Sequence, residues 1–493
     1  MMLLLSILPI ILILILVIAF RRSLFFSAPL TFALTASLAM LVWRMTLNHL
    51  LGASVKGLFI AIEITVIVFG AIFLLETMKR KGIIESIEYH LSKLSADKRV
   101  QMILLAWFFV SFLEGAAGFG TPAAIVAPLL VALGFPAVAA VSVALIGDST
   151  AVVFGAVGTP IRLGFSGLET SGTAFYSGML GLIAGTFVPL MMVAVLVYMS
   201  DRKWKHVKEM IPFSLIAGLC FTVPYFLLSM LDAEFPSLLG SLIGLGLAVI
   251  LIRKKVFLPK EWSFRKKAKI KAKHSFLGAF SPYIVVVLLL LAAKFFPWRN
   301  YSHTINPDIA HTFNIINPGI IFIFVAIAFS AAYGTQIKNS FRESFFKLEK
   351  AFITLFFIAA FVQIMANTSF NFSGLPSMVD IMSRFSQTNA LPFIAPFIGA
   401  LGAFIAGSAT VSNLLFGKVQ ASSAALVGIP ANKILALQVT GASAGNMIAL
   451  NNIVAAQATV KLTGKEGKIL RINIIPCLIY LLIAGLIGLL FLF

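Results

Sequence analysis

Long apolar runs separated by short polar segments make up most of the chain. A helix needs about 20 apolar residues to cross the hydrocarbon core of a membrane. Runs of about this length lie at 2–20, 26–44, 57–78, 136–161, 175–199, 210–231, 235–252, 277–296, 318–336, 351–374, 431–460 and 472–493. The pattern predicts an all-α integral membrane protein with about 12 transmembrane helices.

Two further apolar segments, 100–135 and 393–430, are too long for one helix, and small and polar residues interrupt each near its middle. Basic residues of membrane proteins gather in cytoplasmic loops, and here they cluster at 79–99 and 202–208. If both clusters lie inside, only an even number of crossings fits between them. Segment 100–135 must therefore be a re-entrant helical hairpin. The same reasoning in the second half makes 393–430 a hairpin that enters from the opposite side.

An internal repeat supports the two hairpins. The sequence G-F-P-A at 134–137 recurs 294 positions later as G-I-P-A at 428–431, and at the same offset G-D-S at 147–149 corresponds to G-A-S at 441–443. Two hairpin units of opposite orientation form an inverted repeat, which puts a binding site between broken helices near the middle of the membrane. Chance matching of small residues in apolar sequence is the alternative.

The repeat divides the chain into two halves and a linker. We expect an N-terminal half at 1–252, a basic cytoplasmic loop at 253–276 and a C-terminal half at 277–493. Each half holds one hairpin followed by a broken helix, at 136–161 in the first half and at 431–460 in the second.

The ends and the surface of the protein can also be predicted. A pair of arginines follows the first apolar run rather than preceding it, so we interpret 2–20 as a spanning helix and not as a signal peptide. Both termini are expected outside. Two amphipathic stretches, 83–98 and 338–350, are predicted to form separate helices on the cytoplasmic surface. Segment 297–317 is expected to be the longest external loop.

Composition agrees with a membrane protein. Hydrophobic residues make up 60% of the chain and charged residues 11%, and the mean hydropathy is +1.02, which leaves too little polar surface for a soluble fold. The formal net charge of +20 would suit nucleic acid. Because the basic residues lie in short clusters between apolar runs, we expect no nucleic acid and a lipid bilayer as the partner.

Motifs for metals, cofactors and nucleotides are absent from the sequence. It holds two Cys, both in apolar segments, and six scattered His without ligand spacing. No G-x-x-x-x-G-K-[ST] phosphate-binding motif occurs. We therefore expect no metal and no cofactor, and any transport must be driven by an ion gradient.

The first hairpin breaks at E-G-A-A-G-F-G-T-P, residues 114–122. Glycines permit tight turns, and Pro122 can open a second half-helix. The free N–H groups at the start of a half-helix attract anions, so we expect a carboxylate substrate here. The candidate binding residues are Gly115, Gly118, Phe119, Gly120 and Thr121. A packing kink between close helices is the alternative.

Two acids lie at the interrupted segments. Glu114 is the strongest candidate for a proton carrier, because an ionisable group at this depth is costly unless it is paired, hydrated or protonated. A neutral Glu that caps backbone amides is the alternative. Asp148 lies in the first broken helix beside Ser149 and Thr150, and these oxygens could bind a proton, Na⁺ or the hydroxyl of a hydroxy acid.

The roles of two other charged residues stay open. Glu63, inside the third span, could pair with another helix or relay protons. Arg162 lies close to the external edge, where it either marks the membrane boundary or belongs to an access route.

The second half is poorer in charge but rich in small polar groups. Its hairpin breaks at G-S-A-T-V-S-N (407–413), and its broken helix reads T-G-A-S-A-G-N-M (440–447). Ser, Thr and Asn often serve as ordinary contacts between membrane helices. Because the repeat puts this region opposite the first break, we expect part of it to line the site. The candidates are Ser408, Thr410, Ser412, Asn413 and Ser443.

The stretch F-L-E-G-A-A-G-F-G-T-P-A-A-I-V-A-P-L-L-V-A-L-G-F (112–135) closely resembles the L-lactate permease family. F-G-A-V-G-T-P-I (154–161) and G-S-A-T-V-S-N-L-L-F (407–416) resemble it as well, and the likeness extends to G-K-E at 464–466, so it covers essentially the whole chain. The resemblance implies proton symport of lactate in bacterial inner membranes, with glycolate and other 2-hydroxy acids as related cargo. It also implies an ion-transporter fold of hairpin-bearing inverted repeats.

Three positions depart from the pattern of that family. Its members commonly carry an acid where this chain has Ala409 and often a Lys where Asn446 stands, and many have Asn near the position of Asp148. Charge is therefore shifted from the second repeat to the first. This shift leaves the exact substrate and the coupling ion open.

We expect a secondary transporter that imports lactate or a related small 2-hydroxy monocarboxylate with protons by alternating access, with Glu114 and Asp148 as coupling acids. A Na⁺-coupled carrier of another small organic anion is the alternative. A membrane-embedded enzyme is disfavoured because His and metal ligands do not cluster, and a channel because of the twofold repeat. A homodimer is left open.

Overall fold

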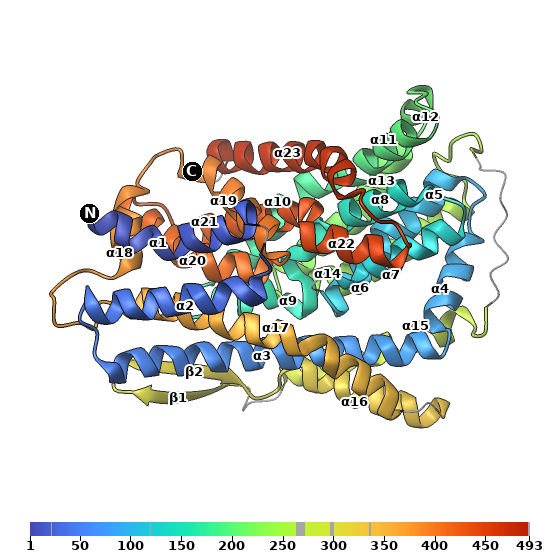
Figure 1. Ribbon diagram of the computed structural model, residues 1–493. Helices are drawn as coiled ribbons and strands as arrows, with labels where there is room; N and C mark the ends of the chain where they lie inside the picture. The colour runs from blue at the N-terminus through green and yellow to red at the C-terminus, as the bar shows by residue number, and fades with distance from the viewer. Residues whose placement is uncertain (21, 119, 263–271, 296–299, 335–336, 492–493) are drawn as a thin grey trace.

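The computed structural model describes residues 1–20, 22–118, 120–262, 272–295, 300–334 and 337–491 (Figure 1). Most helices run along one axis of the molecule, and one helix, α3 (Leu47–Arg80), extends along most of it. The described residues contain one two-stranded sheet. The prediction of an all-α membrane protein therefore holds apart from this small sheet.

The regular elements described in the N-terminal half are all helices, joined by short loops. Besides α3 its helices are α1 (Met2–Leu14), α2 (Leu24–Leu41), α4 (Ile83–Ser92), α5 (Lys98–Ile103), α6 (Val110–Ala116), α7 (Thr121–Ala132), α8 (Ala137–Asp148), α9 (Gly155–Arg162), α10 (Thr173–Thr186), α11 (Val188–Ser200), α12 (Lys205–Lys208), α13 (Ile211–Ser229) and α14 (Pro236–Arg253). Short π-helical and 3₁₀ stretches join several of them, including η1 (Ile15–Ala19), η2 (Leu104–Phe109) and η3 (Thr150–Phe154).

The C-terminal half carries the sheet and the remaining helices. Its elements are α15 (Phe276–Lys294), β1 (Asn300–Asn306), β2 (Ile309–Asn314), α16 (Pro318–Tyr333), α17 (Ile337–Asn367), α18 (Met378–Phe385), α19 (Leu391–Ala406), α20 (Ala409–Leu426), α21 (Ala431–Gly445), η4 (Asn446–Ile448), α22 (Leu450–Thr459) and α23 (Glu466–Phe491). In Figure 1, β1, β2 and α18 lie at one end of the molecule, which we call the β end. The opposite end carries α4, α5 and α12 and is called the α4 end.

Ten helices of the described residues are long and apolar enough to cross a membrane, or 11 if the bent pair α8–α9 forms one span. The sequence predicted about 12 spans, and two differences account for the lower number. Helix α16 is shorter than the run at 318–336. The run at 431–460 is interrupted after α21, so neither of its halves is long enough alone. Segment 98–116 qualifies by length, although the chain turns back after it.

Both predicted hairpin segments fold as pairs of adjacent helices joined by a glycine turn. Helix α7 returns beside α6 after a turn in which Gly118 and Gly120 have φ of 62° and 73°. Helix α20 returns beside α19 after Gly407, whose φ is 70°. Glycine adopts such left-handed conformations without the clash that a Cβ would cause. In Figure 1 the first pair extends inward from the α4 end and the second from the β end.

Two predictions about the polar segments are wrong. Residues 338–350 do not form a separate surface helix but continue without a break into the next apolar run as α17 (Ile337–Asn367). The polar residues simply lie on the part of this helix nearer the α4 end. The segment at 297–317, expected to be a loop, contains the antiparallel strands β1 and β2. These strands pack against α3, where His311 contacts Glu63.

A buried ion pair fastens the start of the first hairpin at the α4 end. The Arg99 guanidinium is 0% exposed and donates to both carboxylate oxygens of Asp97, at 3.1 and 2.6 Å. It also donates to the carbonyls of His206 and Lys260, each at 2.8 Å. One side chain therefore ties α5 to α12 and to the segment that follows α14.

Replacing Arg99 with Ala should lower the free energy of unfolding by about 3–5 kcal/mol, because the Asp97 carboxylate would stay buried without its partner. Unfolding of the purified protein in mixed micelles measures the change. Arg80→Ala is the matched control, since its ion pair with Glu343 is half exposed and such pairs contribute about 1 kcal/mol or less. Equal losses in both variants would contradict this assignment.

Candidate functional site

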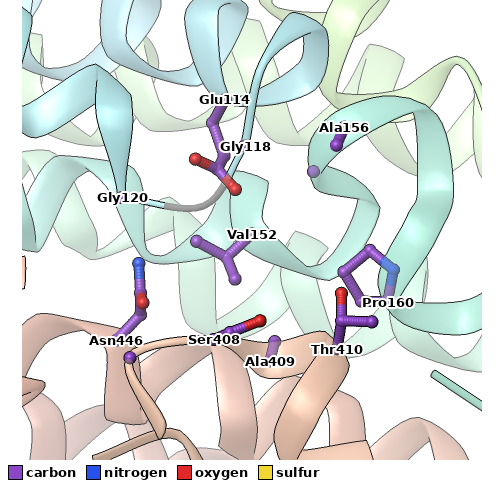
Figure 2. Close-up of a pocket in the computed structure, with 12 residues that line it drawn as sticks. Glu114, Gly118, Gly120, Val152, Ala156, Pro160, Ser408, Ala409, Thr410 and Asn446 are labelled. Carbon is purple, nitrogen blue, oxygen red and sulfur yellow. The ribbon is translucent and has the colours of Figure 1, made fainter. Parts of the chain in front are cut away.

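The turns of the two hairpins meet at one interior cavity (Figure 2). Its described lining residues are Glu114, Gly118 and Gly120 from the first hairpin, Val152, Gly155, Ala156 and Pro160 from the first broken helix, Gly407, Ser408, Ala409 and Thr410 from the second hairpin, and Asn446 from the second broken helix. In Figure 2, Glu114 lies on one wall and Ser408 and Thr410 on the opposite wall, with Val152 between them. The cavity volume is about 10 Å³. This conformation therefore has room for a water molecule but not for a three-carbon acid.

The start of α7 presents backbone donors to the first turn. Gly120 precedes the helix in a left-handed conformation, and no side chain caps the first N–H groups of the helix. Pro122 lies in the first turn of α7, where its missing N–H costs nothing. The Thr121 hydroxyl donates to the Gly118 carbonyl at 2.8 Å and so closes the turn. Uncapped N–H groups at a helix start are suited to an anion.

The second turn is built in a similar way. Ser408 precedes α20 in an extended conformation, and its hydroxyl accepts a hydrogen bond from the Val411 N–H at 3.4 Å. Helices α7 and α20 thus begin at the same cavity, although they belong to hairpins that extend from opposite ends of the molecule. The cavity is therefore bordered by the positive ends of two helix dipoles.

A chain of polar side chains links the two halves beside this cavity. The carboxyl groups of Glu114 and Asp148 are buried next to each other. The Asn446 amide donates to Asp148 Oδ2 at 3.5 Å, and the Asn452 amide donates to Asn446 Oδ1 at 2.5 Å. Two buried carboxyl groups side by side are costly when both are charged, because like charges repel and burial disfavours the ionised form.

The carboxyl pair is not saturated by its surroundings. Among the described residues, neither Glu114 Oε2 nor Asp148 Oδ1 has a hydrogen-bond partner, although both atoms are buried. Buried polar atoms without partners are rare in folded proteins and often mark functional positions. These two oxygens are available to a water molecule, an ion or a substrate hydroxyl.

An irregular backbone brings the pair together. After α8 the chain bends by 44° into the segment Thr150–Arg162, which contains the 3₁₀ stretch η3 and α9. Ala156 and Val157 have φ of 41° and 56°, a left-handed conformation that is costly for residues with a side chain. A side chain at Gly155 would collide with the Glu114 carboxyl. The strained bend therefore makes room for the acid of the neighbouring hairpin.

The structure brings some of the predicted site residues together and separates others. Glu114, Gly118, Gly120, Ser408 and Thr410 line the cavity, and Asp148 joins Glu114 next to it. Phe119 lies outside the described residues. Gly115 packs against α14 at Ser237 and Leu238.

The remaining candidates form hydrogen bonds with the backbone of neighbouring residues. The hydroxyls of Ser149, Ser443 and Ser412 donate to the carbonyls of Ile146, Thr440 and Gly399, each at 2.7 Å. The Asn413 amide donates to the Pro160 carbonyl at 2.9 Å and so connects the second hairpin to α9. The Thr150 carbonyl accepts from the Tyr225 hydroxyl at 3.0 Å. These contacts hold the helices around the cavity.

Asn446 was noted in the sequence as a departure from the family pattern but was not among the candidate site residues, although it lines the cavity and contacts Asp148. The 294-residue offset of the internal repeat could have found it. At this offset Val152 corresponds to Asn446, and Glu114 corresponds to Ser408. All four residues line the cavity. Residues at equivalent positions of the two repeat units therefore occupy the same cavity, as Val152 and Asn446 do.

Glu63 and Arg162 lie away from the central cavity. The Glu63 carboxylate pairs with His311 of β2 at 2.8 Å, and Arg162 pairs with Glu234 at 2.8 Å. Both residues line a second, larger cavity of about 240 Å³.

The sequence was compared with protein families and with individual proteins. Residues 2–312 and 298–493 match the model of the family described as "L-lactate permease". The chain belongs to the L-lactate permease family. It is thus a multi-pass membrane transporter of a permease family and not an enzyme.

Individual relatives of this family match over most of their length. The chain is 31% identical to a putative L-lactate permease of Haemophilus influenzae over 490 residues, which cover 90% of this chain and 89% of the relative. It is 28% identical to the glycolate permease GlcA of Escherichia coli over 524 residues, which cover 94% of this chain and 91% of the relative. Among solved structures, the YdaH transporter of Alcanivorax borkumensis aligns with a TM-score of 0.45 at 14% identity, over 86% of this chain and 84% of that chain.

Replacing Gly120 with Ala should abolish transport. A Cβ at this position would meet the Asn452 side chain, with its Oδ1 only 2.5 Å away, and Asn452 in turn holds Asn446. Gly428→Ala is the matched control, because Gly428 has nearly the same φ (74° against 73°) but no atom within 4 Å of an added Cβ. This control should lose only about 1–2 kcal/mol of stability through backbone strain. Lactate uptake by proteoliposomes that contain either variant measures the difference. An active Gly120→Ala variant would contradict the importance of the close approach between Gly120 and Asn452.

Proposed function

We propose that the protein imports lactate or a related small 2-hydroxy monocarboxylate together with protons. The observation that carries this proposal is the buried pair of acids, Glu114 and Asp148, next to a cavity where two helices begin. The pair can hold a proton, and the helix starts can hold a carboxylate. Relatives named L-lactate and glycolate permeases support this class of substrate.

The same arrangement explains why anion and proton would travel together. When the carboxyl pair carries no proton, its negative charges repel a substrate carboxylate in the same buried cavity. When the pair is protonated, this repulsion falls and the α7 and α20 N-termini attract the anion. Substrate therefore binds to the protonated carrier, and the proton offsets the negative charge that the anion brings into the site. The unpartnered Glu114 Oε2 and Asp148 Oδ1 can accept a bond from the 2-hydroxyl group.

Alternating access would follow from two re-entrant hairpins of opposite orientation. In this interpretation 100–135 and 393–430 are hairpins of an inverted repeat, each followed by a broken helix, in two halves at 1–252 and 277–493. The proposal is supported by the opposite directions of the hairpins in Figure 1 and by the cavity between their turns. A cavity of about 10 Å³ corresponds to a closed state. Separation of the two turns would open it to one side at a time.

The location follows from the distribution of basic residues. We place the protein in a bacterial inner membrane with both termini outside, because the basic clusters would otherwise face the wrong side. Helices α1 and α23 support this arrangement, since α1 starts and α23 ends at the β end (Figure 1). The α4 end, with its neighbouring clusters of Lys and Arg, would then face the cytoplasm.

Replacing either acid with its amide should separate substrate movement from proton movement. In Glu114→Gln and Asp148→Asn proteoliposomes, we expect that a pH gradient no longer drives lactate accumulation, with a loss of about tenfold or more. Exchange of labelled for unlabelled lactate needs no net proton movement and should persist. Glu349→Gln removes an exposed acid of α17 and serves as the control.

Two outcomes of this experiment would contradict the proposal. Unchanged pH-driven accumulation in both amide variants would remove these acids from coupling. Accumulation driven by a Na⁺ gradient at equal pH, and not by a pH gradient, would instead identify a Na⁺-coupled carrier of a small organic anion.

A further inference from the structure

The second cavity lies toward the β end and carries unbalanced positive charge. Its volume is about 240 Å³, just below the range of cavities that hold drug-sized molecules. Its walls come from α3, from the end of α9 with the segment that follows it, and from β2. Gly167 on its rim is exposed, so the cavity opens at the surface. Such a space suits a small solute.

Lys56 lines this cavity, and the ammonium group of Lys418, which is not a lining residue, lies beside its rim at Gly167. A Cβ added to Gly167 would lie 3.7 Å from the Nζ of Lys418 and 3.8 Å from the Nζ of Lys56. Lys56 belongs to α3, and Lys418 belongs to α20 of the second hairpin. Both side chains are half-buried. The two groups therefore face the same point, where their charges repel each other.

The acids around the cavity already have cationic or backbone partners. Glu63 pairs with His311, and Arg162 pairs with Glu234. Glu169, in the segment after α9, accepts a hydrogen bond from the Ser171 N–H.

Neither lysine forms an ion pair within the described part of the chain. The Lys418 ammonium donates to the Gln363 amide oxygen at 3.3 Å, and the described residues provide no hydrogen-bond acceptor for Lys56. The positive charge at Gly167 is therefore not neutralised by the acids that the structure describes.

Two helices connect this cavity to the central one. On α9, Pro160 lines the central cavity and Arg162 lines the outer cavity. On α20, Thr410 lines the central cavity, and Lys418 follows it by eight residues, which corresponds to about 12 Å along a helix. A solute held between the lysines would thus be about two helical turns from the wall of the central cavity at Thr410.

We propose that the outer cavity is an access site, which holds the carboxylate of the substrate between Lys56 and Lys418 before it reaches the central cavity. This inference rests on the proposed function, because it takes its ligand to be a small monocarboxylate. A cleft lined by charge of one sign raises the local concentration of the opposite ion and its rate of association. The access site therefore acts on apparent affinity rather than on proton coupling.

The test compares L-lactate uptake by right-side-out and inside-out membrane vesicles. For Lys56→Gln and for Lys418→Gln we expect KM to rise about tenfold when lactate is supplied at the β end, whereas the maximal rate falls much less. With lactate supplied at the α4 end, KM should stay within about twofold of the wild-type value, because the cavity opens at the other end. Lys433→Gln is the control. It removes a charge at the same end, where the neighbouring Asn432 donates to the Ser171 carbonyl, but Lys433 neither lines the cavity nor is among the groups nearest to Gly167 on its rim.

Each outcome of the test decides the inference. An unchanged KM in both lysine variants, or an equal change from the two sides, would overturn it. If Lys418→Gln does not fold, the inference is tested with Lys56→Gln and with the charge-preserving Lys418→Arg. Lys56→Gln should weaken the apparent affinity for lactate at the β end, and Lys418→Arg should keep KM near the wild-type value. Absence of lactate uptake by the wild type contradicts the proposed function instead, so the two failures are distinguishable.

Discussion

The burial of two neighbouring acids, Glu114 and Asp148, is the constraint on which the rest of the site depends. Buried acids inside a membrane are costly unless they share a proton or find polar partners. The bend after α8 and the glycine turns of both hairpins are what bring these partners together. Interrupted helices are tolerated at such depth only where protein or a small wet cavity satisfies the backbone. The cavity is therefore a consequence of the same interruptions that create the proton site.

The two cavities have different roles in the proposed transport of an anion. Lys56 lines the outer cavity and Lys418 lies beside its rim, and in our proposal their charges attract the anion. Glu114 lines the central cavity with Asp148 next to it, and in our proposal this cavity accepts the anion only when these acids are protonated. Helix α20 takes part in both cavities, with Thr410 at one and Lys418 near the other. A shift of the second hairpin would thus change both sites together.

The parts of the site that the sequence predicted follow from local rules. Glycine and proline spacing located both hairpin turns, and the depth of Glu114 and Asp148 in apolar sequence marked them as functional. The remaining features depend on tertiary contacts. Asn446 matters because it reaches Asp148 from the other half, and the left-handed Ala156 and Val157 carry no glycine signal. The strands β1 and β2 are short and polar, and their packing on α3 could not be read from hydropathy.

The account makes one central claim, that the carrier moves a proton with each organic anion. Lightly buffered proteoliposomes with a pH indicator outside test it most directly, when L-lactate is added without any imposed gradient. The account predicts that the external solution becomes more alkaline as lactate enters, and that a protonophore abolishes this signal while lactate uptake continues. Lactate uptake without any alkalinisation would contradict it.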